Sequence, residues 1–123
     1  MEVTADHQTS WAPELDTSHD LFDVAAHASE ITAVLNRRAG SHDSPSLYLA
    51  LRSCKHLHSR LTDESERVVE HGYDAETIED LSCHASELHA LVVEEATSVD
   101  DEELYVAARS LDHLSRRLTD LVS

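Results

Sequence analysis

Histidine and glutamate stand three residues apart at two places in the chain, each time within the tetrapeptide HASE. Imidazole nitrogens and carboxylate oxygens are metal ligands, and helical bundles hold metal ions with such residues on facing helices. On a helical wheel, however, each histidine lies about a quarter-turn from the apolar stripe, and each glutamate lies further out. We therefore interpret the pairs as boundary histidines with solvent-facing glutamates. The alternative is a metal site formed by His27, Glu30, His84 and Glu87.

A row of carboxylates is the second candidate site. Glu76, Asp80, Glu87 and Glu94 fall within a narrow sector of one predicted helix, opposite its apolar side. Carboxylates spaced along a rigid helix can imitate a nucleic-acid backbone and pair with lysine and arginine clusters of a partner. Their mutual repulsion costs stability, which favours a functional reason for the row. Three acids before this helix extend the surface as secondary members: Asp63, Glu66 and Glu70.

A polar strip recurs on two other predicted helices, on the side away from the core. Spacings of four and three residues place its members along one ridge of each helix. The strips are either solvated faces with local ion pairs or a recognition surface presented twice, and we favour the solvated faces. The members are Arg52, His56, Arg60 and Asp63, matched by Arg109, His113, Arg117 and Asp120.

Patterns of catalytic sites are absent from the sequence. The chain contains no glycine-rich phosphate loop, no nucleophile elbow, no HExxH and no CxxC. Cys54 is expected in the core, and Cys83 is expected on the outer side of a helix among acids, which disfavour its thiolate. We therefore expect a non-enzymatic protein without a cofactor.

The net charge is strongly negative, since 9 basic and 25 acidic residues sum to −16. Residues 63–103 hold 15 of the acids and a single base, Arg67. Such a field repels nucleic acid and anionic membranes and attracts basic proteins. We expect a basic protein partner, such as a nucleic-acid-binding enzyme or a toxin, and no direct contact with nucleic acid or membrane. Solubility, or adaptation to a salty cytoplasm, explains the charge equally well.

Compartment is indicated by three features. Two cysteines are too few for a disulfide framework and are typical of a reducing compartment. The sequence has no apolar run of about 18 residues, and its start lacks the pattern of a signal peptide. We expect a cytoplasmic protein.

The sequence repeats itself internally. Residues 21–63 align without a gap with residues 78–120, at an offset of 57, and 20 of the 43 positions are identical. This pattern indicates a tandem duplication of one structural unit.

Each unit is predicted to be a helical hairpin. Apolar residues recur at three- and four-residue steps, and 2 glycines and 2 prolines are too few for the turns of an all-β fold. Helices are predicted near residues 18–39, 46–70, 75–96 and 101–122, within about two to four residues. Gly40 and Gly72 are expected to end helices, and Ser44–Pro45 is typical of a helix start.

One hairpin leaves its apolar stripe exposed, whereas two hairpins bury their stripes against each other. The sequence therefore predicts an all-α fold, an antiparallel four-helix bundle. It consists of two tandem hairpins, residues 18–70 and 75–123, after a flexible N-terminal tail, residues 1–17.

These observations favour a non-enzymatic acidic binding protein of the inhibitor or immunity-protein type, which masks a basic surface and acts as a nucleic-acid mimic. One alternative is the metal-binding bundle described above. Another is an oligomerisation module whose lateral seam contains Val34 and Leu91 with the two HASE histidines. The sequence leaves open whether the protein is a monomer or a homodimer.

Overall fold

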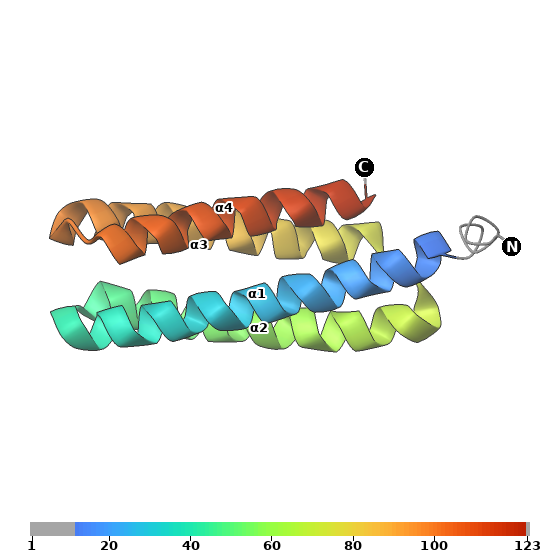
Figure 1. Cartoon of the computed structure of the whole chain (residues 1–123), viewed down its shortest axis with the longest axis horizontal. Coiled ribbons are helices and arrows are strands. Elements are labelled where there is room, and N and C mark those ends of the chain that lie inside the picture. The colour runs from blue at the N-terminus through green and yellow to red at the C-terminus, as the bar shows by residue number, and fades with distance from the viewer. Residues whose placement is uncertain (1–11, 123) are drawn as a thin grey trace, which may run out of the picture.

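The computed structural model describes the backbone of residues 12–122 and the side chains of residues 21–122. Within this range the chain forms four helices and no strand, which confirms the predicted all-α class. The helices are α1 (Ala12–His42), α2 (Pro45–His71), α3 (Ala75–Val99) and α4 (Glu102–Val122). They pack side by side as a bundle (Figure 1).

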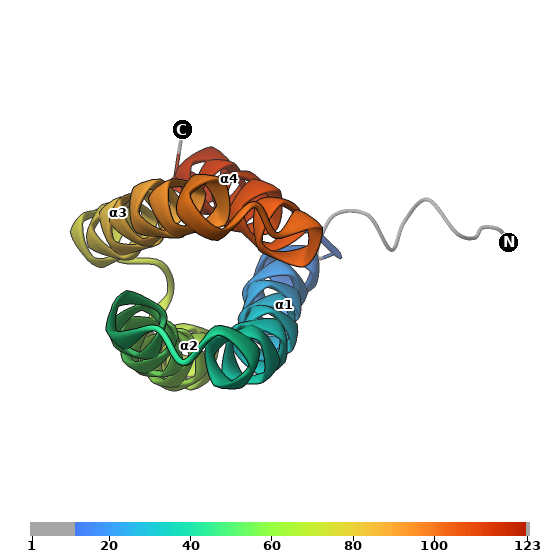
Figure 2. The ribbon, with the colours of Figure 1, turned by 90° about the vertical axis from the view of Figure 1, so that its left-hand side faces the viewer.

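The four helices follow one another in chain order around a common axis (Figure 2). α1 packs against α2 and α4, and α3 packs against the same two helices. The most extensive contacts lie within the pairs α1–α2 and α3–α4. The α1–α2 and α3–α4 connections lie at one end of the bundle, while the α2–α3 connection lies at the other end with the start of α1 and the end of α4 (Figure 1).

The core is aliphatic, and it consists of the residues whose spacing predicted the helices. Leucines dominate, and burying each of them contributes about 1.5–3 kcal/mol. Thr32 and His89, which occupy equivalent positions of the repeat, lie half-buried at the edge of the core. The buried side chains of α2 and α4 include Leu47, Leu57, Leu61, Leu104, Leu111, Leu114 and Leu118.

Residues in the left-handed backbone conformation end α1 and α3. Asp43 has a φ of 49° and Asp100 a φ of 52°. The amide of Asp43 donates to the carbonyl of Ala39 at 2.8 Å, which closes the last turn of α1. Aspartate tolerates this conformation better than most residues. Both helices therefore continue to within one residue of these aspartates and end three residues beyond the predicted ends at 39 and 96.

Gly40 was expected to end the first helix, and this prediction is wrong. The helix continues through Gly40 to His42. Its end is set by Asp43 and by the cap of the next helix, where the Ser44 hydroxyl accepts a hydrogen bond from the Leu47 amide at 3.3 Å. Gly72, with a φ of 76°, does end α2 as predicted.

The start of α1 also differs from the prediction. α1 begins at Ala12, six residues before the predicted start at 18, so residues 12–17 of the predicted tail are helical. Pro13 fits this start, because proline is tolerated in the first turn of a helix, where its missing amide proton has no partner to lose. Residues 1–11 of the predicted tail lie outside the described residues.

No helix in the described part of the chain combines the length and the apolar character needed to cross a bilayer.

Leu57→Ala is expected to lower the free energy of unfolding by about 2–5 kcal/mol, because it opens a cavity at a side chain that is 0% exposed. Leu49→Ala makes the same change on the same helix at a side chain that is 59% exposed, and it should cost less than about 0.5 kcal/mol. Urea unfolding followed by circular dichroism measures both. Equal losses would contradict this placement of the core.

Candidate functional site

The outer side of α3 carries the four carboxylates predicted as a row, Glu76, Asp80, Glu87 and Glu94, which we call the acidic face. All four side chains are exposed. At ~100° per residue they share a sector of ~40°, and at ~1.5 Å per residue the row is ~27 Å long. The helix thus presents the four groups along one line on the surface of the bundle.

Asp80 differs from the other members of the acidic face. One of its carboxylate oxygens, Oδ2, lies 2.5 Å from Nη2 of Arg60 on α2. No ion pair joins Glu76, Glu87 or Glu94 to another described side chain. The uncompensated negative charge of the row therefore belongs to these three glutamates.

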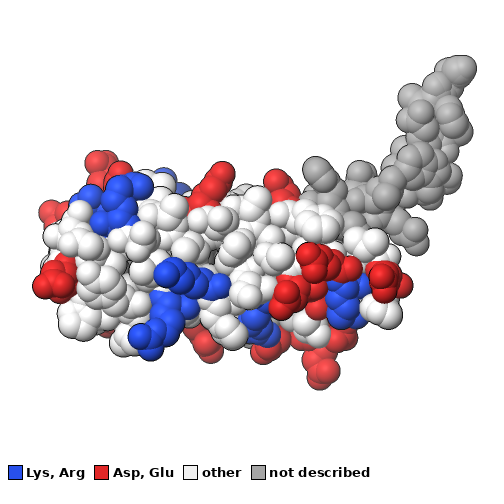
Figure 3. Space-filling view, turned by 90° about the horizontal axis from the view of Figure 1, so that it is seen from below, with Lys and Arg blue, Asp and Glu red and all other residues white. Residues whose placement is uncertain are grey.

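The secondary acids Asp63, Glu66 and Glu70 are exposed near the end of α2. Arg67, the single base of residues 63–103, does not neutralise them. It donates instead to both carboxylate oxygens of the buried Glu64, at 2.9 and 2.5 Å. Seen from the α1–α2 side, basic side chains lie over the left and the middle of the bundle, and acidic ones gather towards the right-hand end, where α2 ends (Figure 3).

The two HASE pairs lie at different helix interfaces. His27 faces α4, where its ring centroid is 6.4 Å from that of His113. His84 faces α2, where its ring lies 5.8 Å from that of His56. Both histidines are half-buried, and the glutamates of both pairs are exposed, as the helical wheel predicted.

This arrangement does not bring His27 and His84 together, because the α1–α4 and α2–α3 interfaces lie on opposite sides of the bundle (Figure 2). Among the described side chains, no three histidine, cysteine, aspartate or glutamate residues cluster closely enough to hold a metal ion.

Two ion pairs join the hairpins at positions that are equivalent in the sequence repeat. Arg117 on α4 binds Asp23 on α1 at 3.0 Å, and Arg60 on α2 binds Asp80 on α3. Adding the repeat offset of 57 to Asp23 and Arg60 gives Asp80 and Arg117. Each predicted polar strip therefore contributes an arginine that reaches a neighbouring helix.

His84 is the most connected of these polar groups. Its Nε2 lies 3.0 Å from the Ser53 hydroxyl, and its Nδ1 lies 3.2 Å from Nη1 of Arg60. Burial lowers the pKa of His84 below its usual 6.5, and the positive charge of Arg60 and the His56 ring lower it further, against the opposing effect of Glu87 and Asp80. The environment therefore favours the neutral imidazole.

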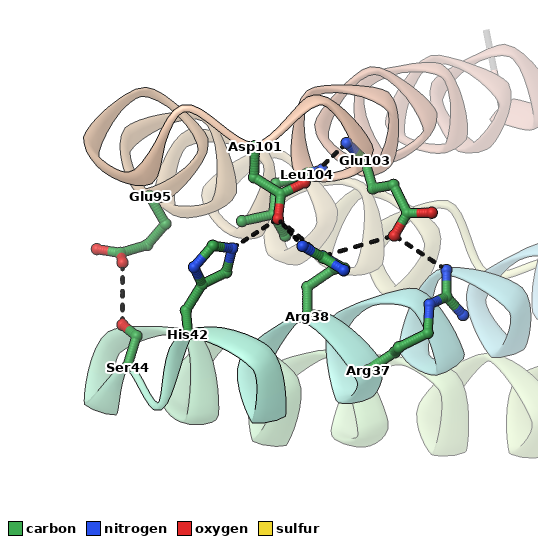
Figure 4. A network of polar contacts seen from close by, with 8 residues as sticks. All are labelled: Arg37, Arg38, His42, Ser44, Glu95, Asp101, Glu103 and Leu104. Carbon is green, nitrogen blue, oxygen red and sulfur yellow. Dashed lines mark hydrogen bonds and ion pairs between the residues drawn. The ribbon is translucent and has the colours of Figure 1, made fainter.

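A buried carboxylate at the α3–α4 connection was not predicted as a site from the sequence. Asp101 is 7% exposed and precedes the first residue of α4. Its Oδ1 accepts hydrogen bonds from the amides of Glu103 and Leu104, at 2.9 and 3.3 Å. Its Oδ2 accepts hydrogen bonds from Arg38 at 2.7 Å and from His42 at 2.6 Å (Figure 4). One side chain thus caps α4 and ties it to α1.

Several effects act on the charge of Asp101. Burial by itself raises its pKa, but the hydrogen bonds from His42, Arg38 and the Leu104 amide, with the charge of Arg38, bring it from 3.8 down to about 2. The sequence contains the signal for the cap, an aspartate directly before an acidic helix start. It contains none for the pairing with α1, which depends on how the hairpins dock.

The equivalent contact on the other side of this end uses different chemistry. Ser44, which caps α2, donates from its hydroxyl to Glu95 on α3 at 3.2 Å (Figure 4). Ser44 and Glu95 stand at the repeat positions of Asp101 and Arg38. At this end of the bundle, the α1–α4 interface therefore holds a charged network, and the equivalent position between α2 and α3 holds the Ser44–Glu95 hydrogen bond.

The two cysteines lie where the sequence predicted them. Cys54 is buried, and Cys83 is exposed on α3. Burial raises the pKa of the Cys54 thiol, although the Thr32 hydroxyl, 3.2 Å from its sulfur, acts in the opposite direction. A protonated, buried thiol is a poor nucleophile.

Arg60→Gln is expected to raise the pKa of His84 towards 6.5, because it removes the cation that disfavours a protonated ring. Folding stability should then fall less steeply as the pH drops below 6.5, because a histidine with a lowered pKa loses stability when the unfolded chain binds its proton first. Titration of the His84 ring by NMR measures the pKa. Arg52→Gln, at an exposed position of the same helix, is the control. A pKa that stays unchanged or falls in Arg60→Gln would refute this assignment.

Asp101→Asn is expected to lower the free energy of unfolding at pH 7 by about 1.5–3 kcal/mol, since the buried contacts to Arg38 and His42 lose their charge. The lowered pKa contributes stability above the unfolded value of 3.8, and this contribution is lost as the pH falls towards about 2. The difference between variant and wild type should therefore shrink over that window.

Urea unfolding at several pH values tests this expectation. Asp100→Asn changes the exposed neighbouring residue and serves as the control. A difference that stays constant down to pH 2 would argue against an ionised Asp101 in the network.

No protein-family model matches the chain, and neither a curated protein nor a solved structure is significantly similar to it.

Proposed function

We propose that the protein is a non-enzymatic binding protein whose acidic face docks on a basic surface of a partner protein and masks it. The proposal is supported above all by Glu76, Glu87 and Glu94, three exposed carboxylates in line on one helix with no ion pair among the described side chains. A folded protein that retains such mutual repulsion has charge available for a partner.

The rigidity of the bundle supports the same proposal. α3 is held from both sides, by α2 and α4, so its carboxylates keep their spacing before a partner arrives. A pre-organised site loses little conformational entropy on binding. Charge complementarity of this kind accelerates association and selects basic partners.

We assign different weights to the predicted residues. Glu76, Glu87 and Glu94 are the primary contacts. Asp80 forms an ion pair with Arg60, so a partner would have to compete with that arginine for its carboxylate. Asp63, Glu66 and Glu70 extend the surface past the end of α2, where they lie exposed.

The biological setting that fits best is an inhibitor or an immunity protein in the cytoplasm. Its partner is a nucleic-acid-binding enzyme or a toxin, whose basic site the carboxylates occupy in place of phosphates.

We further propose that the chain arose by tandem duplication of one helical hairpin, residues 18–70 and 75–123. The matched ion pairs Asp23–Arg117 and Asp80–Arg60 support this origin. The equivalent left-handed residues Asp43 and Asp100 support it as well. Within the aligned range, the two copies differ at one member of the acidic face, since Arg37 stands where the second copy has Glu94.

The triple variant Glu76→Gln, Glu87→Gln, Glu94→Gln should lose binding to the natural partner. A basic protein retained on the immobilised wild type at low salt and released at high salt is identified and purified, and its association rate is measured by surface plasmon resonance. We expect a drop of roughly tenfold or more in this rate, and a weaker salt dependence, because the steering charges are gone.

The matched control removes three charges elsewhere: Asp43→Asn, Asp100→Asn and Asp120→Asn. All three side chains are exposed and lie off the acidic face. The control should retain the association rate to within about threefold, since its net charge equals that of the test variant. Equal rates for the two triple variants would show that net charge alone is responsible and would end the proposal.

A further inference from the structure

A groove of about 480 Å³ runs between α1 and α4. Aliphatic side chains line its floor, namely Ile31, Val34, Val106 and Ala107. Val106 is 52% exposed, which leaves a large apolar side chain uncovered in the lining of the groove. A concave apolar surface of this size is typical of a binding site.

The charges around the groove are unequal. Arg37 on one wall binds Glu103 on the other at 3.2 Å, so these two charges compensate each other. Glu30 on α1 and Glu102 on α4 also line the groove, and neither forms an ion pair with another described side chain. The uncompensated charge is therefore negative, with one carboxylate on each wall.

The length of the groove suits a short helix. Its lining residues on α1 run from His27 to Arg37, and those on α4 from Glu102 to Ser110. At ~1.5 Å per residue these stretches are ~12–15 Å long, or between two and three helical turns. Two antiparallel helices offer a trough into which the apolar side chains of a third helix pack.

We propose that the α1–α4 groove docks an amphipathic basic helix of a partner protein. Aliphatic side chains of that helix cover Val106 and Val34, and its lysines or arginines pair with Glu30 and Glu102. The site is separate from the acidic face: α1 and α3 lie diagonally across the bundle, so the outer side of α3 points away from this groove (Figure 2).

The proposal is tested with a fluorescein-labelled helical peptide of 18 residues, with leucine at helical spacing on one side and lysine on the other. A scrambled peptide of the same composition controls for net charge. Fluorescence anisotropy is expected to show saturable binding of the helical peptide in the micromolar range and at least tenfold weaker binding of the scrambled one.

Two variants locate the peptide. Val106→Asp should weaken binding at least tenfold, whereas Val69→Asp, the same change at a valine that is 62% exposed on α2, should change it less than twofold. Glu30→Gln with Glu102→Gln should weaken binding several-fold and flatten its salt dependence. This pair of substitutions leaves the apolar floor intact, so it tests the charges separately.

Three results would overturn the proposal. The first is an absence of saturable binding, and the second is equal affinity for the helical and scrambled peptides. The third is that the peptide binds both Val106→Asp and Val69→Asp as tightly as it binds the wild type. Binding of a small cationic amphiphile, dodecyltrimethylammonium, without binding of the peptide would assign the groove to a small molecule instead.

The acidic-face variant Glu76→Gln, Glu87→Gln, Glu94→Gln should bind the peptide as wild type does. This test and the test of the proposed function can therefore fail independently of each other.

Discussion

Burial of the aliphatic stripes is the constraint on which every other feature of this protein depends. Each helical hairpin exposes a row of leucines that the other hairpin covers, and the core of the described part of the chain is built from aliphatic side chains and the Cys54 thiol. The apolar centre drives association of the helices, but leucine against leucine specifies their rotation weakly. Polar side chains at the margins of the core must therefore set the register between the hairpins.

Those marginal contacts are few and are placed at both interfaces between the hairpins. Asp23–Arg117 joins α1 to α4 and Asp80–Arg60 joins α2 to α3, and the Asp101 network lies at the end that carries the two hairpin connections (Figure 4). Breaking an exposed ion pair costs little energy, whereas breaking the Asp101 network costs more, because it leaves a buried carboxylate or its donors without partners. The two interfaces are thus unequal in strength, although they are built from corresponding positions of the repeat.

Periodicity made the helices and the core predictable from sequence, because a buried face of a helix repeats every three to four residues whatever its neighbours are. The exposed row Glu76, Glu87 and Glu94 followed from the same arithmetic. Contacts between helices did not follow, since they depend on which helices are adjacent and how each is rotated. The pairing of Asp80 with Arg60 and the docking of Asp101 on Arg38 are of this kind. Gly40 misled the prediction because a left-handed aspartate, Asp43, ends the helix instead.

Under the proposed function, the separation of Glu87 and Glu94 sets a distance that the cations of a partner have to match. They stand seven residues apart on one straight helix, which is two turns or ~10.5 Å. A partner helix meets this requirement with cations at every seventh position. An extended strand matches it less well, because side chains on one of its faces are ~6.6 or ~13.2 Å apart at ~3.3 Å per residue. Under the proposed function, a basic surface whose cations are spaced otherwise would pair with only one of these two carboxylates at a time.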